Sequence, residues 1–216
     1  MAKVSLRYGK SVLTSSIPDE NLLELIEPRD KPGVADPSSE ILHALGNPLR
    51  SKKIPEIAEK GDKAVIVVDD ATRSTPSYLM VPPILNQLNS AGVQDRDITV
   101  IFGRGSHRLV APEEMRNLVG DEVMRRVKVV NHDCRAPDLV HVGDTSRGTK
   151  VYLNKTFVDA DVRILTGDVE LHYYAGYGGA RKSVLPGVAG IESIIHNHQM
   201  AIDPKAKLGN IEGNPV

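Results

Sequence analysis

The sequence predicts an α/β fold: a Rossmann-like, mostly parallel sheet with helices on both faces and a ligand site at the strand carboxyl ends. Two apolar runs, KAVIVV at residues 63–68 and ITVIF at residues 98–102, have no polar alternation. Such runs are typical of strands that are covered on both faces. Each run leads into a polar loop and then a helical pattern, as in parallel sheets with right-handed crossovers. Trp is absent and only two Phe are present, so Val, Ile and Leu must build the core.

The composition is that of an ordinary globular domain and excludes several classes of partner. The chain has 216 residues, 40% hydrophobic and 25% charged, with a net charge of -1. This balance gives no basic field for nucleic acid or an anionic membrane. No apolar run approaches the roughly 20 residues of a membrane span, and residues 1–10 do not resemble a signal peptide. The single cysteine, Cys134, cannot form an intramolecular disulfide, so we expect it to be a packing residue in a cytoplasmic protein.

The first sixty residues give weak signals. Residues 4–7 alternate and are expected to form an edge strand, and residues 17–27 combine early acidic residues with four aliphatic ones, which predicts a helix. Residues 28–39 are rich in Pro, Gly and charge and are expected to be an exposed connection. Short helices are predicted at residues 40–45, capped by Ser38 or Ser39, and at residues 54–60.

From residue 63 onward the sequence predicts strands alternating with helices. Strands are predicted at residues 63–68, 98–102, 127–130, 151–153 and 162–166. Helices are predicted at residues 80–91, ended by Gly92, and at residues 112–119, with Pro112 in the first turn and Gly120 after the end. Residues 191–200 also have a helical pattern.

Four polar loops follow predicted strands, at residues 69–73, 103–108, 131–133 and from 167 onward. In parallel α/β sheets, ligands bind outside the carboxyl ends of the strands. We therefore expect these loops to share one site. His107 and His172 are candidates for general acid–base catalysis, because an imidazole titrates near neutral pH. Asp70 and Arg73 are spaced to orient a histidine and to clamp an anion.

The stretch from residue 167 to 200 concentrates reactive side chains on a Gly-rich backbone. Lys182 follows a Gly-Gly turn; beside the cationic Arg181 its amine would lose a proton more readily and could act as a nucleophile. The stretch is not a phosphate-binding P-loop, because Arg181 occupies the position where that motif requires Gly. His196 and His198 would point to different faces of a helix, so we expect at most one of them to bind a metal.

Three further histidines are weaker candidates. His132 lies at a strand end, where it would orient the site, and His43 and His141 are expected at the surface.

Taken together, DDATR at residues 69–73, GSHR at 105–108, NHD at 131–133, HYYAGYGGARKSVLPG at 172–187 and HNH at 196–198 resemble the nickel-pincer lactate racemase family. The likeness extends from about residue 60 onward, and the order of the motifs is its most specific feature. The resemblance implies a nickel-pincer nucleotide, Ni(II)-pyridinium-3,5-bisthiocarboxylate mononucleotide, tethered to Lys182, with His198 as nickel ligand and His107 and His172 as acid and base. It further implies a set of residues that contact the cofactor, with Arg73 also binding substrate: Asp70, Ala71, Thr72, Arg73, Tyr177, Gly178, Gly179 and Pro186.

The resemblance implies racemisation or epimerisation of a lactate-like 2-hydroxy acid by hydride transfer, with cofactor-synthesis and cofactor-insertion proteins as partners. Members of this family are about twice as long as this chain. We therefore expect residues 1–216 to be a cofactor-bearing N-terminal catalytic domain, inactive without a C-terminal domain or partner chain.

Two other interpretations remain open at this stage. A zinc-dependent hydrolase would use His172, His196 and His198 as its ligands. A non-catalytic cofactor-binding domain would account for the missing half of the enzyme.

Overall fold

The computed structural model describes residues 1–9, 11–27, 29 and 31–216, in two compact units, Met1–Ala35 and Asp36–Val216.

The first unit is an antiparallel hairpin formed by β1 (Ala2–Tyr8) and β2 (Ser11–Ile17) and followed by the 3₁₀ turn η1 (Asp19–Asn21). Leu6 pairs with Leu13, while Ser5 and Thr14 pair on the opposite face and bond through their hydroxyls at 2.8 Å. The predicted edge strand is thus confirmed and is longer than expected.

The predicted helix at residues 17–27 is wrong. Ile17 pairs with Ala2 in the hairpin, and residues 22–27 are irregular. Leu23 is fully exposed and Ile26 is 85% exposed. A short amphipathic helix needs a surface on which to bury its apolar face, and this run has none within the described residues. The predicted connection covers residues 28–39, of which positions 28 and 30 lie outside the described residues. The connection ends earlier than expected, because α1 begins at Pro37.

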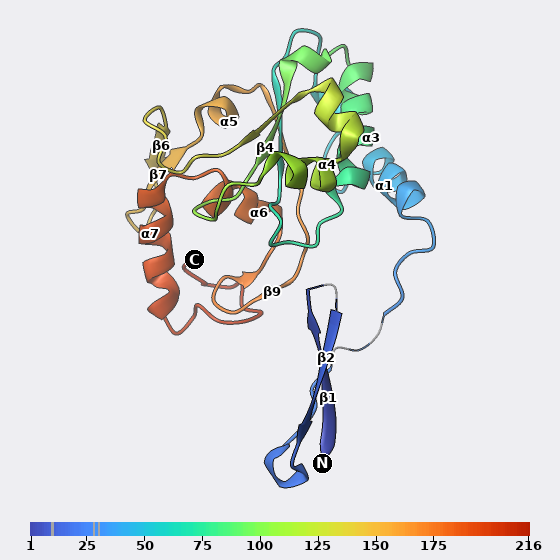
Figure 1. The fold of residues 1–216 in the computed structure, drawn as a ribbon. Helices are drawn as coiled ribbons and strands as arrows, with labels where there is room; N and C mark the ends of the chain where they lie inside the picture. Colours follow the sequence, from blue (N-terminus) through green and yellow to red (C-terminus); the bar gives the residue numbers. More distant parts are fainter. Residues whose placement is uncertain (10, 28, 30) are drawn as a thin grey trace. The chain divides into compact units, whose positions relative to one another are not determined.

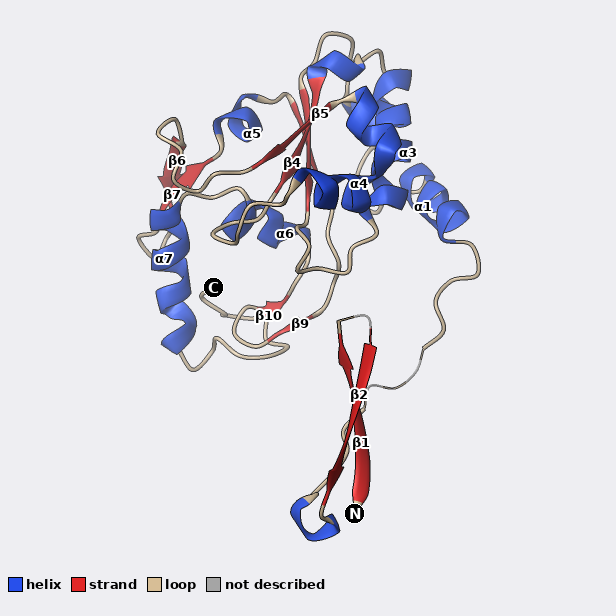
Figure 2. Cartoon of the chain, in the orientation of Figure 1, coloured by secondary structure: helices blue, strands red, loops and turns tan. Residues whose placement is uncertain are grey.

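The second unit is built on a four-stranded parallel sheet (Figure 2) in the order β5-β4-β3-β8. Its strands are β3 (Ala64–Val68), β4 (Ile98–Phe102), β5 (Lys128–Asn131) and β8 (Val162–Leu165). The chain lays down β3, β4 and β5 toward one edge and then returns to place β8 on the other side of β3. This reversal creates a crevice between β3 and β8 at their carboxyl ends, where ligands bind in such sheets.

Helices cover both faces of this sheet, as the sequence predicts (Figure 1). One face packs on α1 (Pro37–Gly46), α2 (Ile54–Ile57), α3 (Ser77–Ser90) and α4 (Pro112–Arg126). The other packs on α5 (Lys155–Asp159) and α7 (Ile191–Gln199). All five residues of β3 are buried, and alternate ones, Val65 and Ile66 for instance, enter opposite cores.

Several helix ends differ from the predictions. Asp36, not Ser38 or Ser39, caps α1, because its carboxylate accepts both serine N–H groups at 3.1 Å. The helix expected at residues 54–60 ends at Ile57, and α3 begins three residues earlier than predicted. The end predicted after residue 119 is confirmed, because Gly120 has a non-helical φ of 86° and ψ of 157°, and a second helical stretch follows it to Arg126.

The remaining elements surround the site. The hairpin of β6 (Val140–Asp144) and β7 (Lys150–Leu153) confirms the strand predicted at 151–153, whereas its partner was not predicted. Short elements complete the unit: η2 (Asp95–Asp97), β9 (Leu171–His172), β10 (Gly176–Tyr177), α6 (Ala180–Lys182), the π-type turn η3 (Ser183–Gly187) and η4 (Met200–Ile202). Cys134 is buried, as expected, and among the described residues no helix is long and apolar enough to cross a membrane.

Candidate active site

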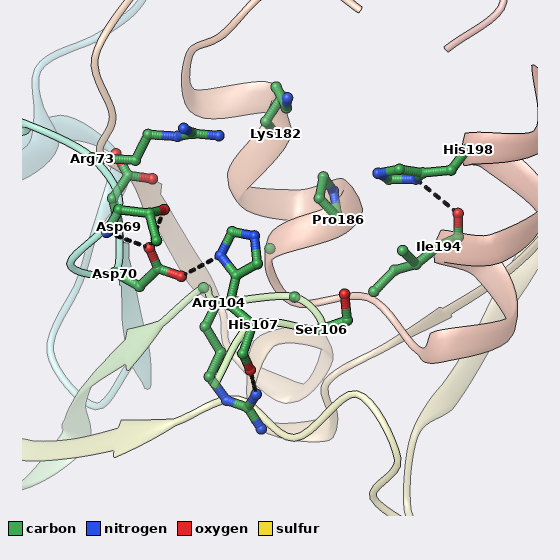
Figure 3. A pocket seen from close by; sticks show the side chains of 14 residues that line it. Asp69, Asp70, Arg73, Arg104, Ser106, His107, Lys182, Pro186, Ile194 and His198 are labelled. Atoms are coloured by element: carbon green, nitrogen blue, oxygen red, sulfur yellow. Dashed lines mark hydrogen bonds and ion pairs between the residues drawn. The ribbon is translucent and has the colours of Figure 1, made fainter. Parts of the chain in front are cut away.

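A hollow lies at the carboxyl ends of β3 and β4, beside the segment that follows β8 (Figure 3). Three of the four polar loops contribute to it, together with α7. Its lining residues are Asp69, Asp70, Thr72, Arg73, Gly103, Arg104, Gly105, Ser106, His107, Lys182, Pro186, Gly187, Ile194 and His198. The hollow encloses about 490 Å³ of empty space, part of which is open to solvent. The structure thus brings together side chains that are more than a hundred residues apart in sequence.

One wall is organised by Asp70, which is almost completely buried. Its Oδ1 accepts the Thr72 N–H at 2.9 Å and the Thr72 hydroxyl at 2.6 Å, and its Oδ2 lies 2.7 Å from Nδ1 of His107. Burial acts to raise the pKa of Asp70, but the hydrogen bonds from Thr72 and His107 keep that pKa below its ordinary value. The carboxylate therefore stays ionised and holds the imidazole of His107 by its Nδ1–H.

The loop that carries His107 packs closely on η3. The N–H of Gly105 donates to the carbonyl of Gly187 at 2.9 Å, and Gly105 has a φ of 53°. A Cβ on Gly103 would lie 2.7 Å from the Val67 side chain. Glycine is needed here because the loop approaches both its own sheet and η3. This packing joins the His107 wall to the segment that bears Lys182.

The β3 loop also supplies a second carboxylate and a cation. Asp69 accepts the Thr75 hydroxyl at 2.6 Å, and burial raises the pKa of Asp69 despite that bond. Arg73 lies 3.3 Å from Glu170 in a partly exposed ion pair. Its guanidinium extends toward Lys182 in Figure 3, so two cations face the same space.

Lys182 is half-buried at the start of η3. Burial, reinforced by the charge of Arg73 and opposed by that of Glu170, lowers the pKa of Lys182 to about 8. Within the described residues its amine makes no ion pair, and its Nζ lies 6.0 Å from the centre of the Tyr174 ring. The neutral amine, which a nucleophilic lysine requires, is therefore more accessible here than in an ordinary solvated lysine.

His172 lies in an aromatic and cationic environment. Its ring stacks on Tyr173 at 4.9 Å and meets Tyr174 edge-on at 4.5 Å, and its Nδ1 accepts the Ala175 N–H at 3.2 Å. Burial, followed by the charges of Lys182 and Arg73, lowers the pKa of His172 to about 4. His172 does not belong to the lining of the hollow itself, although the side chains that shift its pKa do.

His198 and His196 point in different directions from α7. The Nδ1–H of His198 donates to the Ile194 carbonyl at 2.8 Å, which leaves Nε2 with a free lone pair at the hollow. His196 instead pairs with the Thr149 hydroxyl at 2.8 Å. Among the described residues no group of three His, Cys, Asp or Glu side chains is placed to hold a metal. The geometry therefore does not support the zinc-hydrolase interpretation, which needs His172, His196 and His198 together.

The prediction that four loops share one site is wrong for the loop after β5, residues 131–133, because none of its residues lines the hollow. Asn131 bonds to the backbone of Val110, and His132 is fully buried beneath the site, with Nε2 2.9 Å from the Ala189 carbonyl. Burial lowers the pKa of His132 despite that bond, so the ring is a neutral structural donor. His43 and His141 are exposed, as expected.

Other predicted residues lie at the margin. Ala71 lines an adjoining smaller hollow beside His107. Three predicted residues do not line the hollow: Tyr177, Gly178 and Gly179. They belong to the segment that leads into α6, where the N–H of Gly178 donates to the Glu170 carbonyl at 2.7 Å. Pro186 does line the hollow, next to the cis bond between Leu185 and Pro186.

Sequence reasoning missed four residues that the structure places at the site. They are Asp69, Arg104, Glu170 and Tyr174. Asp69 and Arg104 stand inside the polar loops already singled out, so their position after a strand was an available signal. The roles of Glu170 and Tyr174 depend on how the chain folds back after β8, which no local pattern reveals.

Together these features define a class: a Rossmann-like α/β domain with a hollow at the carboxyl ends of β3 and β4, lined by a half-buried lysine, an Asp–His pair and a histidine whose Nδ1 is held by a backbone carbonyl. The chain belongs to the family described as the lactate racemase N-terminal domain, whose model matches residues 8–209. This confirms the family resemblance seen in the sequence.

Known proteins agree with that assignment. Lactate racemases from Thermoanaerobacterium thermosaccharolyticum and Lactiplantibacillus plantarum are each 31% identical over 221 residues, which cover 100% of this chain and 52% of each relative. The structure of the lactate racemase apoprotein from T. thermosaccharolyticum matches with a TM-score of 0.82 at 32% identity, over 99% of this chain and 51% of that one. The chain thus spans about half the length of the curated relatives it matches.

Proposed function

We propose that residues 1–216 form the N-terminal, cofactor-bearing catalytic domain of a racemase or epimerase that acts on a lactate-like 2-hydroxy acid. The relatives named lactate racemase are about twice as long as this chain, so the proposal assigns the rest of the substrate site to a second domain or partner chain. The domain by itself is expected to be inactive, because an open site leaves reacting charges in water.

The observation that carries the proposal is the convergence of Lys182, His198, His107 and Arg73 on one hollow. Each comes from a different segment, and each has the state that its proposed role needs. Lys182 has a pKa of about 8, His198 has a free Nε2, and His107 is held by an ionised carboxylate.

The residues present fit a nickel-pincer nucleotide. Lys182 would form the covalent tether through its neutral amine, and the free Nε2 of His198 is a suitable donor to nickel. Asp70, Thr72, Arg73 and Pro186 line the hollow and would contact the remainder, Ala71 lines the adjoining hollow, and Tyr177, Gly178 and Gly179 would contact it from the segment that leads into Lys182. When bound, this group would supply an electron-poor ring that accepts hydride from carbon and returns it.

This chain's own part in the reaction is proton transfer and orientation. His107 and His172 are carried by separate loops, so each can serve the hydroxyl of one enantiomer. Arg73 would bind the substrate carboxylate through its guanidinium, exchanging its partly exposed contact with Glu170 for the ligand. The proposed partners are the proteins that synthesise and insert the cofactor.

The direct test is the intact mass of the protein produced in a host that makes the cofactor. We expect an adduct on the peptide that contains Lys182, absent in Lys182→Ala and retained in Lys155→Ala, an exposed lysine paired with Asp159. An unmodified Lys182 in a protein that racemises lactate would rule out the tether.

Metal binding is tested separately on the same preparation. His198→Ala should lose nickel while His196→Ala, whose ring faces Thr149, should retain it. Equal nickel content in both variants would remove His198 from the site. An adduct with nickel but no racemisation, even with the downstream half restored, would favour the cofactor-binding domain without catalysis.

A further inference from the structure

Tyr174 occupies a central position among three of the residues assigned above. Its ring meets the ring of His172 at 4.5 Å and 83°, and that of His198 at 5.5 Å and 68°. Lys182 directs its Nζ toward the same ring, 6.0 Å from the centroid. One side chain thus contacts or faces the candidate proton-transfer residue, nickel ligand and tether, which come from different elements.

The backbone at Tyr174 is also fixed from outside its own loop. The Asn214 side chain donates to the Tyr174 carbonyl at 2.9 Å and to the Asn210 carbonyl at 3.0 Å. Gly176 adopts a φ of 81°, and a Cβ there would lie 2.1 Å from the Asn210 carbonyl oxygen. The segment at residues 209–214 is therefore packed tightly against the His172–Gly176 loop and limits where Tyr174 can move.

We propose that Tyr174 is a positioning residue that keeps the rings of His172 and His198 at a fixed separation, with Asn214 fixing its backbone. The inference rests on the proposed function, since it assigns His198 to nickel and His172 to proton transfer. Its physical basis is the edge-on arrangement of aromatic rings, which restricts the orientation of both imidazoles. An imidazole held in one orientation binds a metal more tightly than one that must first be ordered.

The neighbouring Tyr173 provides a matched control. It is 74% exposed, stacks on His172 and meets the Tyr174 ring edge-on at 4.5 Å, but its ring is not paired with that of His198. Replacing Tyr173 therefore removes a direct ring contact with one of the two histidines, whereas replacing Tyr174 removes direct contacts with both. A role of Tyr174 in folding alone would not separate the two variants in nickel content once both are folded.

The experiment compares Tyr174→Leu, Tyr174→Phe and Tyr173→Leu in protein from a cofactor-producing host, with adduct mass and nickel per adduct as readouts. Loss of a residue that orients a ligand lowers metal affinity by roughly 10–100-fold. We expect Tyr174→Leu to keep the Lys182 adduct and lose nickel on dialysis at least tenfold faster. Tyr174→Phe should restore retention, and Tyr173→Leu should retain nickel.

A second readout uses the protein without cofactor. Tyr174→Leu should shift the NMR signals of both His172 and His198, whereas Tyr173→Leu should shift His172 strongly and His198 much less, because Tyr173 reaches His198 only through the Tyr174 ring. Asn214→Ala, which leaves the ring in place, should broaden both histidine signals if the backbone contact orients Tyr174.

The outcomes separate the two ideas. No adduct in the parent protein contradicts the proposed function. A nickel-loaded parent with unchanged nickel retention in a folded Tyr174→Leu variant overturns only the role of Tyr174.

Discussion

The two candidate proton-transfer residues lie in opposite environments. His107 is 52% exposed along its side chain, yet an ionised, buried Asp70 holds its Nδ1 at 2.7 Å. His172 is more enclosed, pairs with no carboxylate in the described part of the chain, and accepts the Ala175 N–H at its Nδ1. The carboxylate places the proton of His107 on Nδ1 and leaves Nε2 as a base, whereas His172 carries its proton on Nε2.

This difference shows that two histidines with the same assigned role are not equivalent in the protein without cofactor. In the tautomer that Asp70 selects, Nε2 of His107 is the acceptor nitrogen. His172, with a pKa of about 4, is a weak base while the cations Lys182 and Arg73 remain nearby. Burial is the first cause of that low pKa, and the charge of Lys182 is the second.

The largest expected effect comes from breaking the Asp70–His107 pair. In Asp70→Asn the amide can donate to Nδ1, which moves the imidazole proton to Nε2 and removes the base. Loss of an orienting carboxylate of this kind costs on the order of 10⁴-fold in rate in serine proteases, where the wrong tautomer results. We expect racemisation by the complete, cofactor-loaded enzyme to fall by about 10³–10⁴-fold.

The measurement is the steady-state rate together with the ¹⁵N shifts of His107, which report its tautomer. Asp133→Asn, whose carboxylate accepts only a local backbone bond from Arg135, is the control. A near-parental rate in Asp70→Asn, with the tautomer changed, would contradict the assignment of Nε2 of His107 as the base.

The next effect concerns the packing that supports the His107 wall. Gly103→Ala introduces a Cβ 2.7 Å from a Val67 methyl group, so the loop or the strand must shift. Overpacking of this kind costs about 1–3 kcal/mol in the free energy of unfolding. Urea denaturation should show that loss, whereas Gly148→Ala, with no atom near its Cβ, reports only the backbone strain of its φ of 80°.

A smaller effect tests the His172 side. Lys182→Met removes the charge that, after burial, contributes most to the low pKa of His172. The pKa of His172 should therefore rise above about 4 in the protein without cofactor, as followed by the NMR titration of its imidazole. Lys155→Met, on an exposed part of α5, should leave the titration unchanged. An unchanged pKa of His172 in Lys182→Met would mean that the charge of Lys182 does not contribute to it, and that burial and the remaining charges set its value.

The sequence predicts the strands and loops that carry this site better than it predicts the side-chain contacts within it. The strands that become β3 and β4 were identifiable because their residues are uniformly apolar, and the loops after them were identifiable by the abrupt change to polar residues. The loop after β5 has the same local pattern, but His132 turns inward to the Ala189 carbonyl, a partner 57 residues away. Glu170, Tyr174 and Asn214 act through contacts between segments, which no periodicity in one segment encodes.

The β1–β2 hairpin illustrates the same limit. Its alternation predicts the first strand, but the partner strand, β2, was not predicted, and the helix predicted at residues 17–27 starts at Ile17, the last residue of β2. Pairing along the hairpin decided the outcome, since a strand is specified by its neighbour as much as by its own composition.

The smallest expected effect concerns the charges around Lys182, one of the cations that lower the pKa of His172. Glu170 opposes the lowering of the Lys182 pKa, and its ion pair with Arg73 at 3.3 Å is partly exposed. In Glu170→Gln the lysine loses a favourable anion while Arg73 keeps its charge, so the pKa of Lys182 should fall below about 8. The sign follows because an anion stabilises the protonated amine and its removal favours the neutral one. The pH dependence of amine acetylation at Lys182, read by mass spectrometry, measures this shift, and Glu192→Gln on α7 is the control.

The free energy of unfolding of Glu170→Gln should change by less than about 1 kcal/mol, since exposed ion pairs contribute little. A Lys182 that becomes less reactive in Glu170→Gln would show that Arg73, once released from Glu170, moves away from the lysine and ceases to lower its pKa.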